Sequence, residues 1–389
     1  MLAEKGHKVT WWSSNFCHTT KSFRTQGQAC IQVSDNCKIM LLKTPAYNTN
    51  VSLQRIWNHY AYARALRVEG EKCHSRPDVI IASLPPLLAA NMALVLANRF
   101  GAKGIIDVQD IWPEAFEVAF PGRLKPVVQM VSLPLKRFAD RVYDKADGVT
   151  AVSQTFLQRT LSVSKDKGKG IMVPLGVDLN LYRHCLGQPV GDVPYIKHDQ
   201  SEFWAVYIGT IGKSYDVKTI LEAAGRLGHT YPNIKFFIAG DGPDLSEMRL
   251  YAESSGLRNT TFTGLLSYLH LTHLLSQCDV GLNAIVASSR TSLPNKVFDY
   301  MAAGLPMINS VNGELGDLLR TEQFGVQYEA GNTGSLAQAI LELHGNPQQR
   351  LSLGQKARRL AEERFDMNRE YLRWHEFLGR IVPARAGSH

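Results

Sequence analysis

The sequence contains few cysteines and lacks the residue spacings that usually mark metal sites, redox pairs and dinucleotide loops. Its six cysteines include no CxxC pair, and none stands near a histidine at zinc-ligand spacing. Neither GxGxxG nor a Walker A motif occurs, which argues against a dehydrogenase and a P-loop NTPase. No stretch reaches the ~18 uncharged apolar residues that a membrane-spanning helix needs. Charges interrupt residues 1–9, so we expect no signal peptide and predict reduced cysteines in the cytoplasm.

The charge of the chain is unevenly distributed. Its 389 residues have a hydrophobic fraction of 44% and a net charge of +8, and this length suggests two to three domains. Residues 1–175 hold 23 basic and 13 acidic residues, a net +10, whereas residues 176–389 hold 20 and 22, a net −2. The excess either aids solubility or indicates an anionic partner such as phosphates or a lipid surface. Nucleic acid is disfavoured because no basic–aromatic module is present.

Short apolar runs alternate with helix-length amphipathic segments, which is the pattern of an α/β protein with parallel sheets. The pattern stops at a polar stretch, residues 187–202, and restarts at the FWAVYI run of residues 203–208. We therefore predict two Rossmann-like doubly wound domains. The expected divisions are 1–186, a linker over 187–202, a second domain over 203–366 and a C-terminal helix over 367–389 packing back on the first domain. Ligands of such folds bind at the carboxyl ends of the strands.

Three strand-to-helix loops in the second half have the features of phosphate sites. Gly209-Thr-Ile-Gly-Lys213 and Gly240-Asp-Gly-Pro243 follow predicted strands, and each also fits an ordinary turn. The third loop opens a short helix that Pro294 begins and Gly304 ends. Lys296 and Asp299 share one face of this helix. They form either a surface ion pair or a site where the lysine binds a diphosphate and the carboxylate binds ribose hydroxyls.

The segment LPNKVFDYMAAGLP resembles the nucleotide-sugar motif of family 4 retaining glycosyltransferases, which have the GT-B fold. AVYIGTIGKSYDVKTILEA, FFIAGDGPDLSEM, FTGLLSY and CDVGLNAI resemble other parts of the family's second domain, in the right order. ADRVYDKADGVTAVSQTF and VPLGVDLNLY resemble the end of its first domain. KVTWWSSNFCHTTKSFR, RIWNHY and DVQDIWPEAF are most similar to the bacterial branch that builds O-antigen, capsule and exopolysaccharide. The resemblance implies two domains that face each other across a cleft.

The family motif has two glutamates eight residues apart, and Asp299 stands at the second, which holds the ribose. The first falls at Thr291, so the carboxylate that contacts the donor sugar is missing. The main-chain N–H groups that hold the diphosphate map to Leu293 and Pro294. Proline has no N–H to donate, and Lys296 is the expected replacement.

The family's arginine and lysine at the start of the second domain fall at Thr210 and Tyr215, and Lys213 is the expected substitute. The nucleotide base is expected against the loop after FTG. The donor-binding residues that the resemblance implies are Gly209, Gly212, Lys213, Gly240, Gly264, Leu265, Ser292, Leu293, Lys296 and Asp299.

In the first domain, the family has a histidine or similar group at the end of about the fourth strand, where this chain reads QDIWPE. Asp110 and Glu114 are candidates for contacting sugar hydroxyls or the acceptor nucleophile, and a helix N-cap with a first-turn acid accounts for them as well. His18, Arg24 and Trp112 are expected on the acceptor side. The implied catalytic residues are Asp110, Glu114, Lys213 and Lys296.

The chain opens on MLAEKGHKVTWW, which resembles the end of the family's first helix and its second strand. We therefore expect the first domain to lack the family's first strand and Gly-rich loop, through a late start codon or a truncation. A missing central strand would leave a sheet edge exposed and weaken the fold.

The resemblance implies glycosyl transfer with retention from a UDP-, GDP- or dTDP-sugar to a lipid-linked glycan acceptor, with no cofactor and no metal. Lys213, Lys296 and helix N-termini would stabilise the charge of the departing diphosphate. Residues 122–138 mix apolar and basic side chains, so they fit either a core helix or contact with an anionic membrane surface. The expected location is the cytoplasm, on the cytoplasmic face of the inner membrane.

Two other functions remain open from the sequence. A sugar-nucleotide 2-epimerase of the same fold would need carboxylates in the cleft and no acceptor. A non-catalytic paralogue that binds a partner enzyme is favoured by Thr291, Pro294 and the missing strand.

Overall fold

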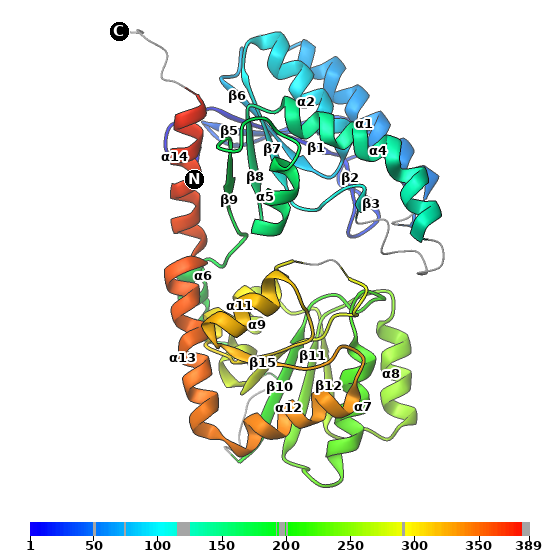
Figure 1. The fold of residues 1–389 in the computed structure, drawn as a ribbon, viewed down its shortest axis with the longest axis vertical. Helices are drawn as coiled ribbons and strands as arrows, with labels where there is room; N and C mark the ends of the chain where they lie inside the picture. Colours follow the sequence, from blue (N-terminus) through cyan, green and yellow to red (C-terminus); the bar gives the residue numbers. More distant parts are fainter. Residues whose placement is uncertain are drawn as a thin grey trace. The chain divides into compact units, whose positions relative to one another are not determined.

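The computed structural model divides the chain into two compact units, shown in Figure 1. Unit 1 contains Met1–Val173 and Tyr371–His389, and unit 2 contains Pro174–Glu370. The structure describes residues 1–49, 52–73, 75–114, 125–191, 193, 199, 201–289 and 292–382. Part of the expected linker, residues 192, 194–198 and 200, lies outside these residues, as does Thr291.

Unit 2 is built on a six-stranded parallel sheet with the order β12-β11-β10-β13-β14-β15. Its strands are β10 (Phe203–Ile208), β11 (Ile234–Ala239), β12 (Thr260–Gly264), β13 (Val280–Asn283), β14 (Met307–Asn309) and β15 (Gly325–Gln327). Its helices are α6 (Leu179–Leu186), α7 (Val217–Gly228), α8 (Leu245–Ser254), α9 (Tyr268–Gln277), α10 (Lys296–Ala303), α11 (Glu314–Glu322), α12 (Thr333–Gly345) and α13 (Pro347–Arg364).

Both faces of this sheet are buried, as the continuous apolar strands predict. Alternate residues of β10 point to opposite faces. Trp204, Val206 and Ile208 belong to a core shared with α9, α10 and α13. Phe203, Ala205 and Tyr207 belong to a second core with α7, α8 and α12. The sheet is therefore doubly wound, and the loops at the carboxyl ends of its strands are available for a ligand site.

Unit 1 contains several smaller sheets. A parallel sheet has the order β6-β7-β8-β9, a mixed sheet has the order β1-β5-β4, and β2 and β3 form an antiparallel pair. The strands are β1 (Val9–Ser14), β2 (Phe16–Cys17), β3 (Ser22–Phe23), β4 (Ala29–Ser34), β5 (Cys37–Leu42), β6 (Val79–Leu84), β7 (Lys103–Val108), β8 (Gly148–Ala151) and β9 (Gly170–Met172). The helices are α1 (Leu53–Glu71), α2 (Leu87–Phe100), α4 (Lys125–Lys145), α5 (Gln154–Leu161) and the part of α14 (Met367–Ile381) from Tyr371 onward.

Among the described strands, the two larger sheets of unit 1 end at β1 and β4 and at β6 and β9, each with a single neighbour. β1 pairs only with β5, and β6 pairs only with β7. A doubly wound parallel sheet normally continues through such positions. The parallel strands of unit 1 are therefore divided between two sheets, and the absence of the family's first strand stays a prediction.

The ends of the units follow from local packing. Helix α6 packs against α9 within unit 2, and Val177 forms an isolated parallel bridge with Asp366. In unit 1, α14 packs on β8, where a Cβ on Gly148 would lie 2.3 Å from Ile381. In the part of the chain that the structure describes, no helix is both long and apolar enough to cross a membrane.

Candidate functional site

The carboxyl ends of β10 and β13 define the candidate ligand site of unit 2. These neighbouring strands continue in opposite directions across the sheet, because β10 leads to β11 and β13 leads to β14. In an open parallel sheet such a point leaves a crevice between two loops that diverge. The loop after β10 carries Gly209 and Lys213, and the loop after β13 leads into α10 at Lys296. Sequence reasoning placed donor contacts on these two loops.

Two of the predicted glycines are required because backbones touch. A Cβ on Gly240 would lie 1.8 Å from the carbonyl oxygen of Gly209, and a Cβ on Gly242 would lie 2.2 Å from that of Ile211. The N–H of Gly209 donates to Ala239. The loops after β10 and β11 are thus packed against each other, and any side chain at Gly240 would force them apart.

Lys296 is the most unusual charged residue of unit 2. Its side chain is buried, and its Nζ lies 3.7 Å from the ring centroid of Tyr207 and 4.6 Å from that of Tyr215. Among the described residues this Nζ has no hydrogen-bond partner. Burial lowers its pKa well below the ordinary value of 10.5. A Cβ on Gly209 would be only 3.3 Å from this Nζ, so the glycine leaves the amine in contact with the loop.

A buried amine with no hydrogen-bond acceptor carries a desolvation cost that an anionic ligand would offset. The two tyrosine rings offset part of this cost through cation–π attraction. Tyr215 stands where the sequence comparison expected a lysine, and the structure brings Lys296 to that place from α10. Lys213, the expected substitute, is exposed on the loop after β10.

Asp299 lies one turn along α10 and makes a different contact. The hydroxyl of Tyr268 donates to its Oδ1 at 3.3 Å, and burial raises the pKa of the carboxyl to about 6. No ion pair joins Asp299 to Lys296 in the part of the chain that is described. The two side chains therefore do not form the surface pair that their spacing also allowed, and each retains its capacity to bind a ligand.

The remaining predicted donor residues lie on the same edge of the sheet. Ser292 is buried, and its hydroxyl donates to Glu314 Oε2 at 2.7 Å. Leu293 packs on the core beside α10. Gly264 ends β12 at φ +72°, and Leu265 after it is 82% exposed. Glu314 is a residue that sequence reasoning missed, although Gly313 before it marked the start of a helix.

The predicted residues of unit 1 differ in how their side chains are engaged. Asp110 follows β7, accepts from the N–H of Ile111 at 2.9 Å, and has a pKa raised by burial. Glu114 is buried and accepts from Arg159 at 2.6 Å, and Arg159 also donates to Asp140 at 2.8 Å. These contacts are those of a buried ion pair, whereas Asp110 is partly buried and has Trp112 and Arg55 nearby.

Of the predicted acceptor residues, His18 follows β2, Arg24 follows β3, and Trp112 lies near His59 of α1. His18 Nδ1 lies 2.5 Å from the hydroxyl of Tyr47. Arg24 donates to the hydroxyl of Ser13 and the carbonyl of Ser14, each at 3.3 Å. The ring of Trp112 lies 5.7 Å from that of His59, measured between centroids. Within the described residues, no group of three histidine, cysteine, aspartate or glutamate side chains is arranged to hold a metal ion.

Comparison with known proteins gives the relatives of this sequence. WcaI of Escherichia coli K12, named as a colanic acid biosynthesis glycosyl transferase, is 26% identical over 256 residues, which are 63% of this chain and 61% of WcaI. EpsD of Bacillus subtilis 168, named as a glycosyltransferase, is 27% identical over 163 residues, 42% of each chain. The matched segments therefore span about 61% and 42% of these curated relatives.

Solved structures share the fold at low identity. Sucrose-phosphate synthase of Thermosynechococcus elongatus has a TM-score of 0.72 at 18% identity, covering 98% of this chain and 91% of that one. HepE of Anabaena, solved with UDP, has a TM-score of 0.64 at 16% identity, covering 88% and 86%.

Family models match in both units. Residues 1–181 match the family described as Glycosyltransferase Family 4, and residues 195–360 match Glycosyl transferases group 1. These two segments cover most of the chain, and the parallel sheets are those of the structural neighbours. The two family matches and the shared fold together support a family 4 type of glycosyltransferase with the GT-B fold.

Proposed function

We propose that this chain transfers a sugar from a nucleotide diphosphate sugar to a glycan acceptor, with retention of the anomeric configuration. The observation that carries the proposal is the buried amine of Lys296 at the crevice of unit 2, without a hydrogen-bond partner among the described residues. HepE, which shares the fold, has been solved with UDP and with UDP-glucose. These complexes support a nucleotide-sugar donor for this chain.

In the proposed donor complex, the diphosphate accepts from Lys296 and from the N-terminus of α10. The ionised carboxylate of Asp299 accepts hydrogen bonds from the two ribose hydroxyls. The negative charge of the diphosphate favours the protonated amine of Lys296 and so opposes the effect of burial on its pKa. Lys296 and the N-terminus of α10 stabilise the negative charge of the diphosphate, so the proposal assigns no step to a metal ion.

In the proposed transfer, the bond between the anomeric carbon and the diphosphate oxygen breaks. A bond from the acceptor hydroxyl oxygen forms on the same face of the sugar. The acceptor proton passes to the departing phosphate oxygen, which leaves as the nucleoside diphosphate. Lys296 stabilises the charge that grows on this leaving group. Asp110 is the candidate that positions the acceptor hydroxyl in unit 1, because Glu114 is engaged by Arg159.

The proposed acceptor is a glycan linked to a polyprenyl diphosphate at an anionic membrane surface on the cytoplasmic side. Helix α4 supports this location because apolar side chains recur on one face and are exposed, with Val127, Met130 and Val131 at 54%, 70% and 71%. Lys136 and Arg137 follow on the same helix. Replacing Met130 and Val131 by glutamate should abolish sedimentation with anionic vesicles and leave donor binding intact. Unchanged sedimentation would refute the membrane part of the proposal.

A thermal-shift screen of UDP-, GDP- and dTDP-sugars tests the donor part. We expect one nucleotide series to raise the Tm of the wild-type chain, and the shift to disappear in Asp299→Asn. Lack of any shift across the three series would refute the donor proposal and favour a non-catalytic paralogue. Conversion of the sugar nucleotide without an acceptor would indicate the 2-epimerase alternative.

A further inference from the structure

The turn between β2 and β3 and the first turn of α1 bring three basic side chains close to aromatic rings. Lys21 Nζ lies 3.4 Å from His18 Nδ1 and 4.6 Å from the ring centroid of Tyr47. The guanidinium carbon of Arg55 lies 5.4 Å from the ring centroid of Trp112. We call His18, Lys21 and Arg55 the cationic cluster. None of these three contacts has a role in the donor site of unit 2.

The charged forms of the three side chains in the cationic cluster disfavour one another. Partial burial lowers the pKa of His18, and the charges of Lys21 and Arg55 lower it further. Burial and Arg55 lower the pKa of Lys21 in the same way. His59 on α1 has its pKa lowered to about 4 by burial, Arg55 and His18. One acidic group near Arg55 is Asp110, whose pKa burial raises and Arg55 lowers, with the effect of burial larger. A ligand with negative charge would relieve this repulsion.

The backbone at Lys21 supports a ligand-binding role. Its φ is +53°, in the left-handed region that a residue with a side chain adopts at a cost of about 1–2 kcal/mol. This conformation turns the lysine back onto His18 and Tyr47. Strain of this kind is retained mainly where a site requires it.

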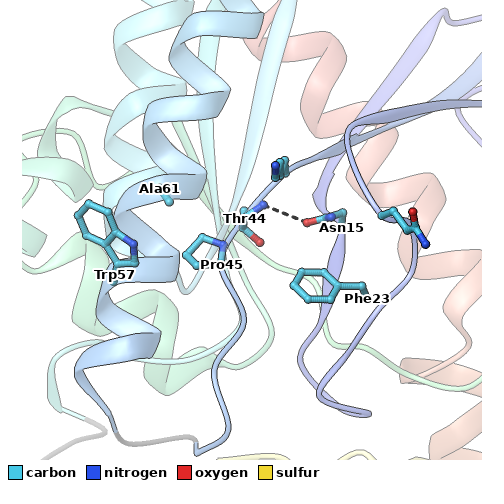
Figure 2. A pocket seen from close by; sticks show the side chains of 8 residues that line it. Asn15, Phe23, Thr44, Pro45, Trp57 and Ala61 are labelled. Atoms are coloured by element: carbon cyan, nitrogen blue, oxygen red, sulfur yellow. Dashed lines mark hydrogen bonds between the residues drawn. The ribbon is translucent and has the colours of Figure 1, made fainter.

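An open apolar pocket of about 630 Å³ lies on the same loops (Figure 2). Phe23 lines it from β3 and Pro45 from the segment after β5, while Trp57 and Ala61 line it from α1. The remaining lining residues are Asn15, Gln26, Lys43 and Thr44. We call this the Phe23–Trp57 pocket.

A row of aromatic rings joins the pocket to the cationic cluster. The ring of Phe16 lies 5.4 Å from that of Phe23 and 4.9 Å from that of Tyr47, and Tyr47 contacts His18. An apolar pocket and a group of cations are therefore connected within one unit. This combination matches a molecule that has a hydrocarbon chain at one end and phosphate at the other.

We propose that unit 1 binds the phosphate end of an isoprenoid lipid, with the phosphates at the cationic cluster and the first apolar units in the Phe23–Trp57 pocket. This inference rests on the proposed function, for which it names the residues that recognise the lipid of the acceptor. Tyr47 and Trp112 hold the cations in place between binding events through cation–π contacts.

Cys17 provides a local probe, because hydrogen bonds from Thr20 lower its thiol pKa to about 7 and it adjoins His18. The experiment measures iodoacetamide alkylation of Cys17 in the full chain by peptide mass spectrometry. The exposed Cys30 serves as the internal reference. At pH 7 we expect farnesyl diphosphate to slow alkylation of Cys17 by about fivefold, because the added anion raises the thiol pKa by about one unit. Alkylation of Cys30 should not change.

Inorganic diphosphate distinguishes a free phosphate from a lipid headgroup. We expect it to protect Cys17 only at concentrations at least about 30-fold higher than farnesyl diphosphate, because it buries no hydrocarbon. Equal protective concentrations would refute the role of the pocket. Lack of protection by either compound would refute the site.

Variants assign the protection to the named residues. Lys21→Met and Arg55→Gln should each raise the protective concentration of farnesyl diphosphate by about 10- to 100-fold. Arg67→Gln is the matched control on α1, since its ion pair with Glu71 is exposed. Trp57→Ala should reduce the ratio between the protective concentrations of inorganic diphosphate and farnesyl diphosphate. Unchanged values in folded Lys21→Met and Trp57→Ala would overturn the assignment.

The result is distinguishable from failure of the proposed function. Donor binding depends on Lys296 and Asp299 in unit 2, and the thermal shift by a nucleotide sugar is measured on the same protein samples. Donor binding without protection of Cys17 would refute this inference alone. Protection of Cys17 without donor binding would refute the transferase and leave the lipid site standing.

Discussion

Replacing Lys296 by methionine should change stability and donor binding in opposite directions. Methionine has a similar length and volume and no charge, so the pocket between Tyr207 and Tyr215 stays filled. The change removes a buried amine without a hydrogen-bond partner among the described residues, which costs about 1–3 kcal/mol. It also removes two cation–π contacts, each worth about 0.5–1 kcal/mol. The midpoints of these ranges leave a net gain of about 0.5 kcal/mol, or about 1–2 °C in Tm.

The same change should weaken the donor. A hydrogen bond to a charged group contributes about 1.5–3 kcal/mol, so the Kd for the nucleotide sugar should rise about 10- to 150-fold. Calorimetric titration measures the affinity, and thermal unfolding without ligand measures the stability. Lys213→Met is the matched control, because Lys213 is exposed on the loop after β10. It should leave the Tm within about 1 °C and the Kd within about fivefold.

Two results would contradict this reasoning. A large fall in Tm for Lys296→Met would mean that the amine stabilises the fold by itself. An unchanged Kd would mean that the diphosphate binds elsewhere. If Lys213→Met gave the larger loss of affinity, Lys213, and not Lys296, would be the main cation that binds the diphosphate.

The remaining predictions concern single groups. Because the folded-state pKa of Asp299 is about 6, above its ordinary 3.8, the free energy of unfolding of the ligand-free chain should fall by at most about 3 kcal/mol as pH rises from about 4 to 6. Urea titrations should show this slope reduced in Asp299→Asn, and donor affinity should increase above pH 6. Gly240→Ala should destabilise by about 3 kcal/mol or abolish folding, while Gly27→Ala, which meets open space, should change stability by less than about 0.5 kcal/mol. Glu114→Gln should lower the free energy of unfolding by about 2–3 kcal/mol in chemical denaturation, because Arg159 loses a buried charged partner. Unchanged stability with lost transferase activity would make Glu114 a catalytic residue instead.

The strands and helices with clear periods could be predicted from sequence. The apolar runs at Phe203–Ile208 and Ile234–Ala239 are strands with those bounds, and the Ala/Leu-rich segment Leu87–Phe100 is a helix with those bounds. Helix α1 was not predicted, because its apolar and polar residues alternate without a stripe that faces the core. The hairpin of β4 and β5 was also missed, since β4 is largely exposed and lacks a buried face.

The candidate site could be predicted only in part. Glycines after strands indicated the loops at Gly209 and Gly240, and the helix that carries Lys296 indicated the third loop. The sequence did not reveal that Lys296 lies between two tyrosines from another strand and loop, since this depends on pairing β10 with β13. Likewise, Arg159 is 45 residues from Glu114, and no local pattern relates them. Contacts between distant segments decide which of several candidate side chains remain available.

The stereochemistry of the product tests the central claim most directly. The chain would be incubated with the nucleotide sugar that binds and with a monosaccharide linked to a polyprenyl diphosphate, and the product would be examined by mass spectrometry and proton NMR. The account predicts release of nucleoside diphosphate only with the acceptor, and a product larger by one sugar with the anomeric configuration of the donor. An inverted anomer, or an epimerised donor formed without the acceptor, would contradict it.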